Sequence, residues 1–146
     1  MLNRLLTLCC LACVGCAGPV TEKIFVANND PHDLYANIDQ DSTSLFYQKI
    51  VPKGKPKGVL VILPGSGELV ADVQQQIDLD ELAVKQNLLV VIPSINWGTN
   101  KHYYEHQFLD LIFKQVVEAH QVPKDKFVLG GFSGGGMLAM KLACEQ

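Results

Sequence analysis

The sequence predicts an α/β fold with a mostly parallel sheet and helices on both of its faces. Three short runs, residues 59–63, 88–92 and 127–129, are continuously apolar. Such runs, without polar alternation, are typical of parallel strands buried on both faces. Segments with helical periodicity separate them, and strands that alternate with helices predict a parallel sheet. The chain of 146 residues is long enough for one domain of this kind.

The elements follow in order. Residues 18–43 form a mixed, polar N-terminal segment, and residues 44–51 are expected to form a strand that ends at the Pro- and Gly-containing loop 52–58. Residues 72–86 are expected to form one helix, and residues 104–120 another. A last helix is expected to begin at about Gly135. The core-facing side chains expected on the first two helices are Val73, Ile77, Leu79, Leu82 and Ala83, then Phe108, Leu111, Ile112, Gln115 and Val116.

The charge balance bears on possible partners. The formal net charge is -3, and Arg4 is the only arginine. Without the first 17 residues, 11 lysines remain against 15 acidic residues, a net charge of -4. Nucleic acids and phosphorylated ligands usually recruit arginine and positive charge, so we expect no nucleic-acid partner.

Residues 1–17 have the pattern of an export signal. Arg4 precedes an apolar run over residues 5–14, which is shorter than the roughly 20 residues needed to cross a bilayer. Small residues follow, and Cys16 lies where a lipoprotein signal carries the cysteine that becomes lipidated. We expect a periplasmic or cell-envelope lipoprotein attached to the membrane through Cys16. The alternative is ordinary cleavage after Ala17 and secretion.

Cysteine usage agrees with such a leader. Four of the five cysteines lie within it, at positions 9, 10, 13 and 16. Only Cys144 remains in the body, so no disulfide within the domain is expected. We expect Cys144 to be a small hydrophobic core residue.

Residues 131–135, Gly-Phe-Ser-Gly-Gly, fit the pattern G-x-S-x-G between an expected strand and an expected helix. In this context the serine occupies a strained turn that exposes its hydroxyl above the sheet. Side chains at Gly131 and Gly135 would collide in so sharp a turn. Ser133 is therefore the candidate nucleophile, and the N–H of Gly134 at the helix start is a candidate oxyanion donor.

A second oxyanion donor is expected from the loop after the first buried strand. Residues 64–67, Pro-Gly-Ser-Gly, occupy that place, and a glycine-rich turn brings backbone N–H groups close to a reacting carbonyl. We expect the N–H of Ser66 to be this donor, with the N–H of Gly67 as the alternative.

Residues 59–67 and 127–139 resemble the oxyanion loop and nucleophile elbow of the α/β-hydrolase superfamily, in the style of secreted serine esterases and polyester depolymerases. The resemblance covers residues 44–146 and implies the N-terminal half of such a domain, a partial fold without the later strands. It implies hydrolysis of a small-molecule or polymeric carboxylic ester through an acyl-enzyme at Ser133, with no cofactor. The family places its acid and histidine after the nucleophile, and neither Asp nor His follows Ser133 here. We therefore expect the chain by itself to be inactive.

Other functions remain open. The chain can be a non-catalytic exported binding protein or pseudo-enzyme, because no general base is evident. Residues 102–106 also match H-x-x-E-H, a zinc-protease pattern in which His102 and His106 bind metal and Glu105 is the base. We expect no metal there, since a third ligand is not apparent. A catalytic base supplied by His102 or His106 is the remaining alternative.

Overall fold

The structure is a computed structural model that describes residues 18–26, 46–95 and 102–145, without the side chains of residues 102–104. The leader, including Cys16, lies outside the described residues. Among those described, no helix is long and apolar enough to span a bilayer.

Five strands form one sheet in the order β1-β2-β4-β3-β5. β1 (Val20–Phe25) and β2 (Phe46–Val51) are antiparallel to their neighbours, whereas β3 (Gly58–Leu63) runs parallel to both β4 (Leu88–Pro93) and β5 (Phe127–Gly131). The carboxyl ends of the three parallel strands therefore point to the same end of the sheet. The predicted α/β fold is confirmed, and the apolar run of each parallel strand forms part of this sheet.

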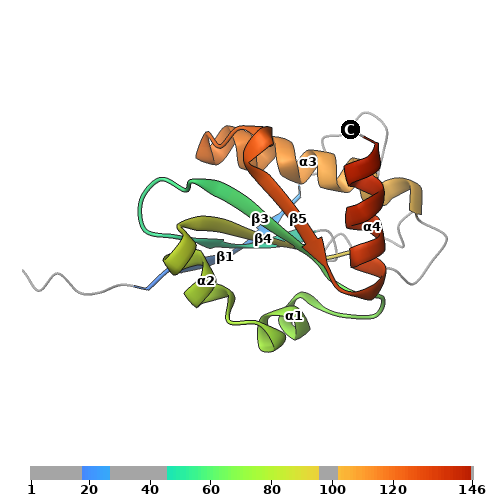
Figure 1. Cartoon of the computed structure of the whole chain (residues 1–146), viewed down its shortest axis with the longest axis horizontal. Helices are drawn as coiled ribbons and strands as arrows, with labels where there is room; N and C mark the ends of the chain where they lie inside the picture. The colour runs from blue at the N-terminus through green and yellow to red at the C-terminus, as the bar shows by residue number, and fades with distance from the viewer. Residues whose placement is uncertain (1–17, 27–45, 96–101, 146) are drawn as a thin grey trace, which may run out of the picture.

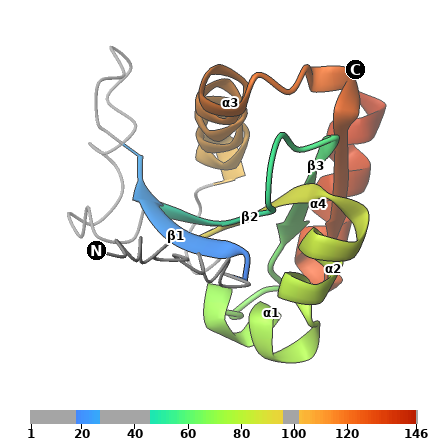
Figure 2. The same cartoon turned by 90° about the vertical axis from the view of Figure 1, so that its left-hand side faces the viewer.

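Helices cover both faces of the sheet, giving three layers (Figures 1 and 2). On one face, α3 (His102–His120) and α4 (Ser133–Cys144) pack over a core that includes Val61, Leu109 and Leu138. On the other face, α1 (Val70–Gln76) and α2 (Leu79–Gln86) cover a second core that includes Ile62 and Val90. Neighbouring residues of β3 and β4 thus enter opposite cores, which explains why these strands show no polar alternation.

The single helix expected over residues 72–86 is wrong, because the chain forms two helices there. Ile77 is extended, with φ -135° and ψ 134°. Asp78 then caps α2, since its carboxylate accepts a hydrogen bond from the N–H of Glu81 at 2.9 Å. The break lets Val73 of α1 and Leu79 of α2 both reach the same core. Residues 76–78 contain no proline or glycine that would indicate the break. The sequence signal for it is Asp78, because aspartate is a preferred N-cap residue.

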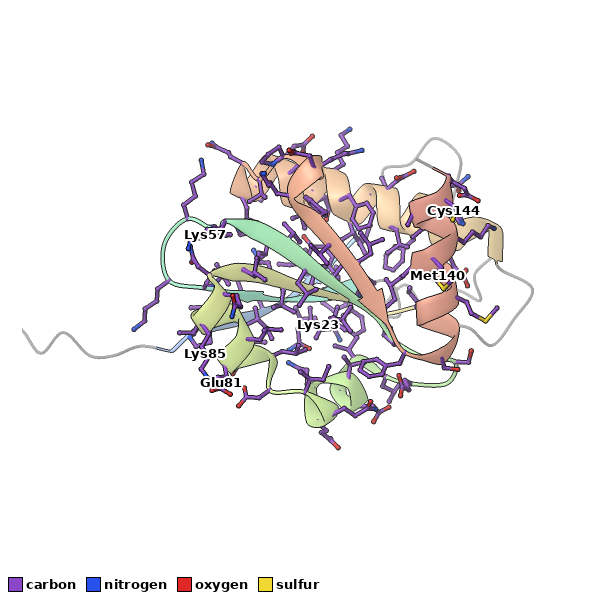
Figure 3. All side chains as sticks on the ribbon, viewed as in Figure 1. Lys23, Lys57, Glu81, Lys85, Met140 and Cys144 are labelled. Atoms are coloured by element: carbon purple, nitrogen blue, oxygen red, sulfur yellow. The ribbon has the colours of Figure 1, made fainter. Side chains whose placement is uncertain are left out.

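Four further expectations need correction. Residues 20–25, assigned to a polar segment, form β1 at one edge of the sheet. β5 is not buried on both faces, because Val128 is 59% exposed. Cys144 is exposed rather than buried in the core and lies on α4 together with the exposed Met140 (Figure 3). Helix α4 begins at Ser133, two residues before the expected start.

Candidate functional site

The turn between β5 and α4 has the backbone that a nucleophile elbow needs. Ser133 follows the last strand directly and has φ +43°, a left-handed conformation that is rare for a residue with a side chain. Strain of this kind persists only where the surroundings enforce it, and it is common at functional sites. Ser133 is the first residue of α4. Figure 1 shows that this helix begins where β5 ends, at the carboxyl end of the parallel strands.

The two outer glycines of the motif are required by close backbone contacts. A Cβ at Gly131 would lie 2.5 Å from the carbonyl carbon of Gly135, so the two ends of the turn touch. A Cβ at Gly135 would overlap the carbonyl oxygen of Leu63 and lie 2.5 Å from that of Pro64. Gly135 therefore allows α4 to lie directly against the end of β3, next to the glycine-rich loop of residues 64–67.

Backbone hydrogen bonding joins the elbow to that strand. The N–H of Phe132 donates to the carbonyl oxygen of Leu63 at 3.1 Å, and the N–H of Gly136 donates to Phe132 at 3.2 Å. The first bond extends the β3–β5 ladder by one residue and fixes the residue before Ser133. Leu63 is also the last residue before the glycine-rich loop. The two segments predicted to form the site are therefore both attached to Leu63.

The structure brings Ser66 to the elbow. A Cβ built on Gly134 would lie 2.6 Å from the Oγ of Ser66 and 3.6 Å from its backbone nitrogen. Ser66 and Gly134, the two residues chosen from the sequence as oxyanion donors, are therefore neighbours. Gly67, the alternative donor, has φ +82°, and a Cβ built on it would meet no atom within 4 Å.

The same loop contains a carboxylate that the sequence did not single out. Glu68 Oε2 accepts the N–H of Gly65 at 2.6 Å, and the N–H of Glu68 donates to the carbonyl oxygen of Gly65 at 3.0 Å. Both backbone polar groups of Gly65 are thus occupied by Glu68. This leaves Ser66 and Gly67 as the loop residues whose N–H groups remain for an oxyanion.

The two described imidazoles lie away from Ser133. His106 Nδ1 is 3.3 Å from Glu145 Oε2, just beyond the last residue of α4. Ser133 begins that 12-residue helix, which places the two ends about 18 Å apart. The alternative that His106 supplies the base is therefore wrong for this arrangement.

His120 is also engaged elsewhere. Its Nε2 lies 3.4 Å from Lys49 Nζ, which also pairs with Glu22 at 3.0 Å. Burial lowers the pKa of His120, with a further lowering by the positive charge of Lys49 and an opposing effect of Glu22. Burial likewise raises the pKa of Tyr47, and Glu22 adds to that rise. These groups belong to the β1–β2 side of the sheet, not to the elbow.

Two of the three residues of the zinc pattern, Glu105 and His106, have described side chains. Glu105 is buried, His106 contacts Glu145, and no group of three His, Cys, Asp or Glu side chains converges among the described residues. The side chain of His102 lies outside them. A hollow of about 570 Å³ between α3, β5 and the end of α4 is lined by residues that include His106 and Phe127, and Ser133 is not among them.

Neither a protein-family model nor a curated protein matches the sequence. The structure, however, is similar to solved structures of other proteins. The chain is similar to a fluorophosphonate-binding serine hydrolase from Staphylococcus aureus, FphF (TM-score 0.67, 17% identity, 89% of this chain and 53% of that chain). It is also similar to the S-formylglutathione hydrolase FrmB of the same organism (0.62, 17%, 88% and 52%). A third neighbour is the S-formylglutathione hydrolase from Agrobacterium tumefaciens (0.58, 17%, 70% and 48%).

These neighbours define the class of fold. The chain adopts a partial α/β-hydrolase fold, and it spans about half the length of each of these hydrolases. At 17% identity the likeness concerns the fold, because one fold can carry many different activities.

Proposed function

We propose that the chain carries the nucleophile and oxyanion loop of a serine hydrolase that acts on carboxylic esters, either small or polymeric. The observation that carries this proposal is the strained Ser133, held at a strand-to-helix turn whose next residue, Gly134, faces Ser66 of the glycine-rich loop. A turn made only for packing would not need a side chain at positive φ, and glycine would be less costly there.

The chemistry would follow the usual acyl-transfer course. Ser133 Oγ attacks the ester carbonyl carbon, and the carbonyl π electrons move to oxygen to give an oxyanion. The N–H groups of Gly134 and Ser66 stabilise that oxyanion, and the N-terminus of α4 adds a favourable dipole. Collapse of the intermediate expels the alcohol and leaves an acyl-enzyme, which water then hydrolyses.

The proton on Ser133 needs an acceptor, and both described imidazoles are engaged elsewhere, His106 with Glu145 and His120 with Lys49. Because an unassisted hydroxyl is a poor nucleophile, we expect the chain alone to hydrolyse esters negligibly. An activated ester is the appropriate probe, since its leaving group departs without protonation.

The test supplies the base from solution. Hydrolysis of p-nitrophenyl butyrate is measured with and without added imidazole, for the wild type and for Ser133→Ala. We expect almost no turnover without imidazole, and a wild-type rate with imidazole that exceeds the rate of Ser133→Ala under the same conditions. The variant corrects for the ester hydrolysis that imidazole causes by itself.

Two results would lead to other conclusions. Equal imidazole-dependent rates for the wild type and Ser133→Ala would favour a non-catalytic binding protein or pseudo-enzyme. Fast Ser133-dependent hydrolysis without imidazole would show that the chain has its own base. In that case loss of activity in His102→Ala would identify it.

We also propose export as a lipid-anchored protein, from the leader pattern and Cys16. Expressed with its leader in a bacterial host, the protein should incorporate radiolabelled palmitate, and Cys16→Ala should not. Cys13→Ala is the matched control and should still be labelled. Release of a protein cleaved after Ala17 without lipid would contradict anchoring and leave export intact.

A further inference from the structure

Glu68 makes three hydrogen bonds that the acyl-transfer chemistry does not use. Two of them engage Gly65: the carboxylate accepts its N–H at 2.6 Å, and the N–H of Glu68 donates to its carbonyl oxygen at 3.0 Å. A four-residue turn, residues 65–68, is thereby closed twice, by the backbone and by the side chain. Gly67 at φ +82° is the third residue of that turn, where a left-handed conformation suits glycine.

The other carboxylate oxygen connects the turn to a helix. Gln76 Nε2 donates to Glu68 Oε1 at 3.0 Å, and Gln76 is the last residue of α1. The backbone of Gly65 is thus tied through Glu68 to a helix whose Val70 and Val73 are buried in the core. This connection holds the turn to a part of the molecule that packing keeps in place.

The turn is held next to the elbow. A Cβ at Gly65 would lie 2.9 Å from Glu68 Oε2 and 3.4 Å from the carbonyl oxygen of Phe132. Gly65, which the carboxylate holds, therefore lies close to the residue that precedes Ser133. Ser66, the next residue of the turn, contacts Gly134 on the other side of the serine.

We propose that Glu68 is a positioning residue of the oxyanion hole, which holds the 65–68 turn so that Ser66 stays beside Gly134. This inference rests on the proposed function, because an oxyanion hole matters only if Ser133 reacts. Two glycines make the turn flexible, and donors stabilise an oxyanion efficiently only when they are already in place. A hydrogen bond to a charged acceptor is stronger than one to a neutral acceptor, which suits a carboxylate to this role.

The kinetic test compares Glu68→Ala with Glu68→Gln, which retains an acceptor of similar shape. Labelling of Ser133 by a fluorophosphonate is followed by intact mass. We expect Glu68→Ala to lower the labelling rate by about tenfold or more, since removal of a whole donor costs about 10²–10³. Glu68→Gln should recover most of the rate.

Glu81→Ala is the matched control. Glu81 is a surface carboxylate of α2 that pairs with Lys85 away from the elbow (Figure 3). We expect its labelling rate to equal that of the wild type. In imidazole-assisted ester hydrolysis, Glu68→Ala should lower kcat and leave KM unchanged, because the oxyanion forms after the substrate binds. A rise in KM alone would contradict a positioning role.

An NMR measurement tests the position of the turn independently of any reaction. In the wild type, the amide proton of Gly65 should exchange slowly with solvent. Glu68→Ala should accelerate this exchange and shift the amide resonances of Ser66 and Gly134, whereas Glu68→Gln and Glu81→Ala should not.

The two measurements separate the possible failures. If the wild type shows no labelling at Ser133 but the amide changes occur, the proposed function fails and the turn is held as described. Wild-type labelling rates in Glu68→Ala, or unchanged resonances of Ser66 and Gly134, would overturn the positioning role of Glu68.

Discussion

Gly135 decides how closely helix α4 approaches the end of β3 and the loop that follows it. Its missing side chain leaves the space that the carbonyl oxygens of Leu63 and Pro64 occupy. Both contacts are with backbone, so a substitution there cannot be relieved by turning a side chain. The whole start of α4, with Ser133, would have to shift away from β3.

We therefore expect Gly135→Ala to destabilise the protein by about 1–3 kcal/mol, as is usual when extra atoms enter a packed site. Gly130→Ala is the control, because a Cβ there meets Ile62 at an ordinary 3.7 Å. That change should be neutral or stabilise the fold by up to about 1 kcal/mol. Urea unfolding of both variants measures the difference. Equal midpoints would contradict the close approach of α4 to β3.

At the level of single residues, the sequence pattern predicted the turn that contains Ser133. It did not predict the contacts of Glu68 with the neighbouring loop. Ser133, Gly134 and Ser66 follow from a serine pattern and a glycine-rich loop, each placed after an apolar strand. Glu68 carries no such signal, because a glutamate after a glycine is ordinary in sequence. Its role depends on the 65–68 turn and on Gln76 of α1, which come together only in the folded chain.

Strand β5 differs from the other parallel strands because one of its sides is unpaired in the described part of the chain. It bonds to β3 alone there, and it lies at the end of the described sheet. Val128 is 59% exposed on this strand, and Met137 and Met140 of α4 are exposed nearby in sequence. An unpaired strand edge with exposed apolar side chains is a template for association.

We expect the isolated protein to self-associate through this edge, and Val128→Lys to reduce the association, since a charged edge residue opposes strand pairing. Val84→Lys is the control, because Val84 is similarly exposed, at 51%, but lies on α2. Sedimentation velocity over a range of concentrations measures both. A wild-type protein that remains monomeric would contradict this expectation.

Elements with strong apolar patterns were predicted well, and those that depend on tertiary contacts were not. The strands β3 and β4 and the helix α3 agree with expectation to within two residues. β1 alternates weakly and becomes a strand by pairing with β2, with Lys23 lying over the rings of Phe25 and Phe46. The break between α1 and α2 exists because both helices must bury a residue in one core.

For the molecule as a whole, the arrangement of the sheet explains why a chain of this length can form an elbow. β3 and β5 are neighbours in the sheet although a complete strand, β4, and three α-helices, α1, α2 and α3, separate them in sequence. Their carboxyl ends therefore bring the glycine-rich loop and Ser133 together within the described residues. The same arrangement does not bring a described imidazole to Ser133. His106 and His120 both belong to α3, where they contact Glu145 and Lys49 respectively.

The most direct test of the central claim is to find where a fluorophosphonate attaches. The chain contains four other serines, at positions 42, 44, 66 and 94, which serve as internal controls. After prolonged reaction and proteolysis, we predict that mass spectrometry finds the adduct on Ser133, formed slowly because no described base assists it, and that Ser133→Ala remains unlabelled. Label distributed over the other serines, or none on Ser133, would contradict the account.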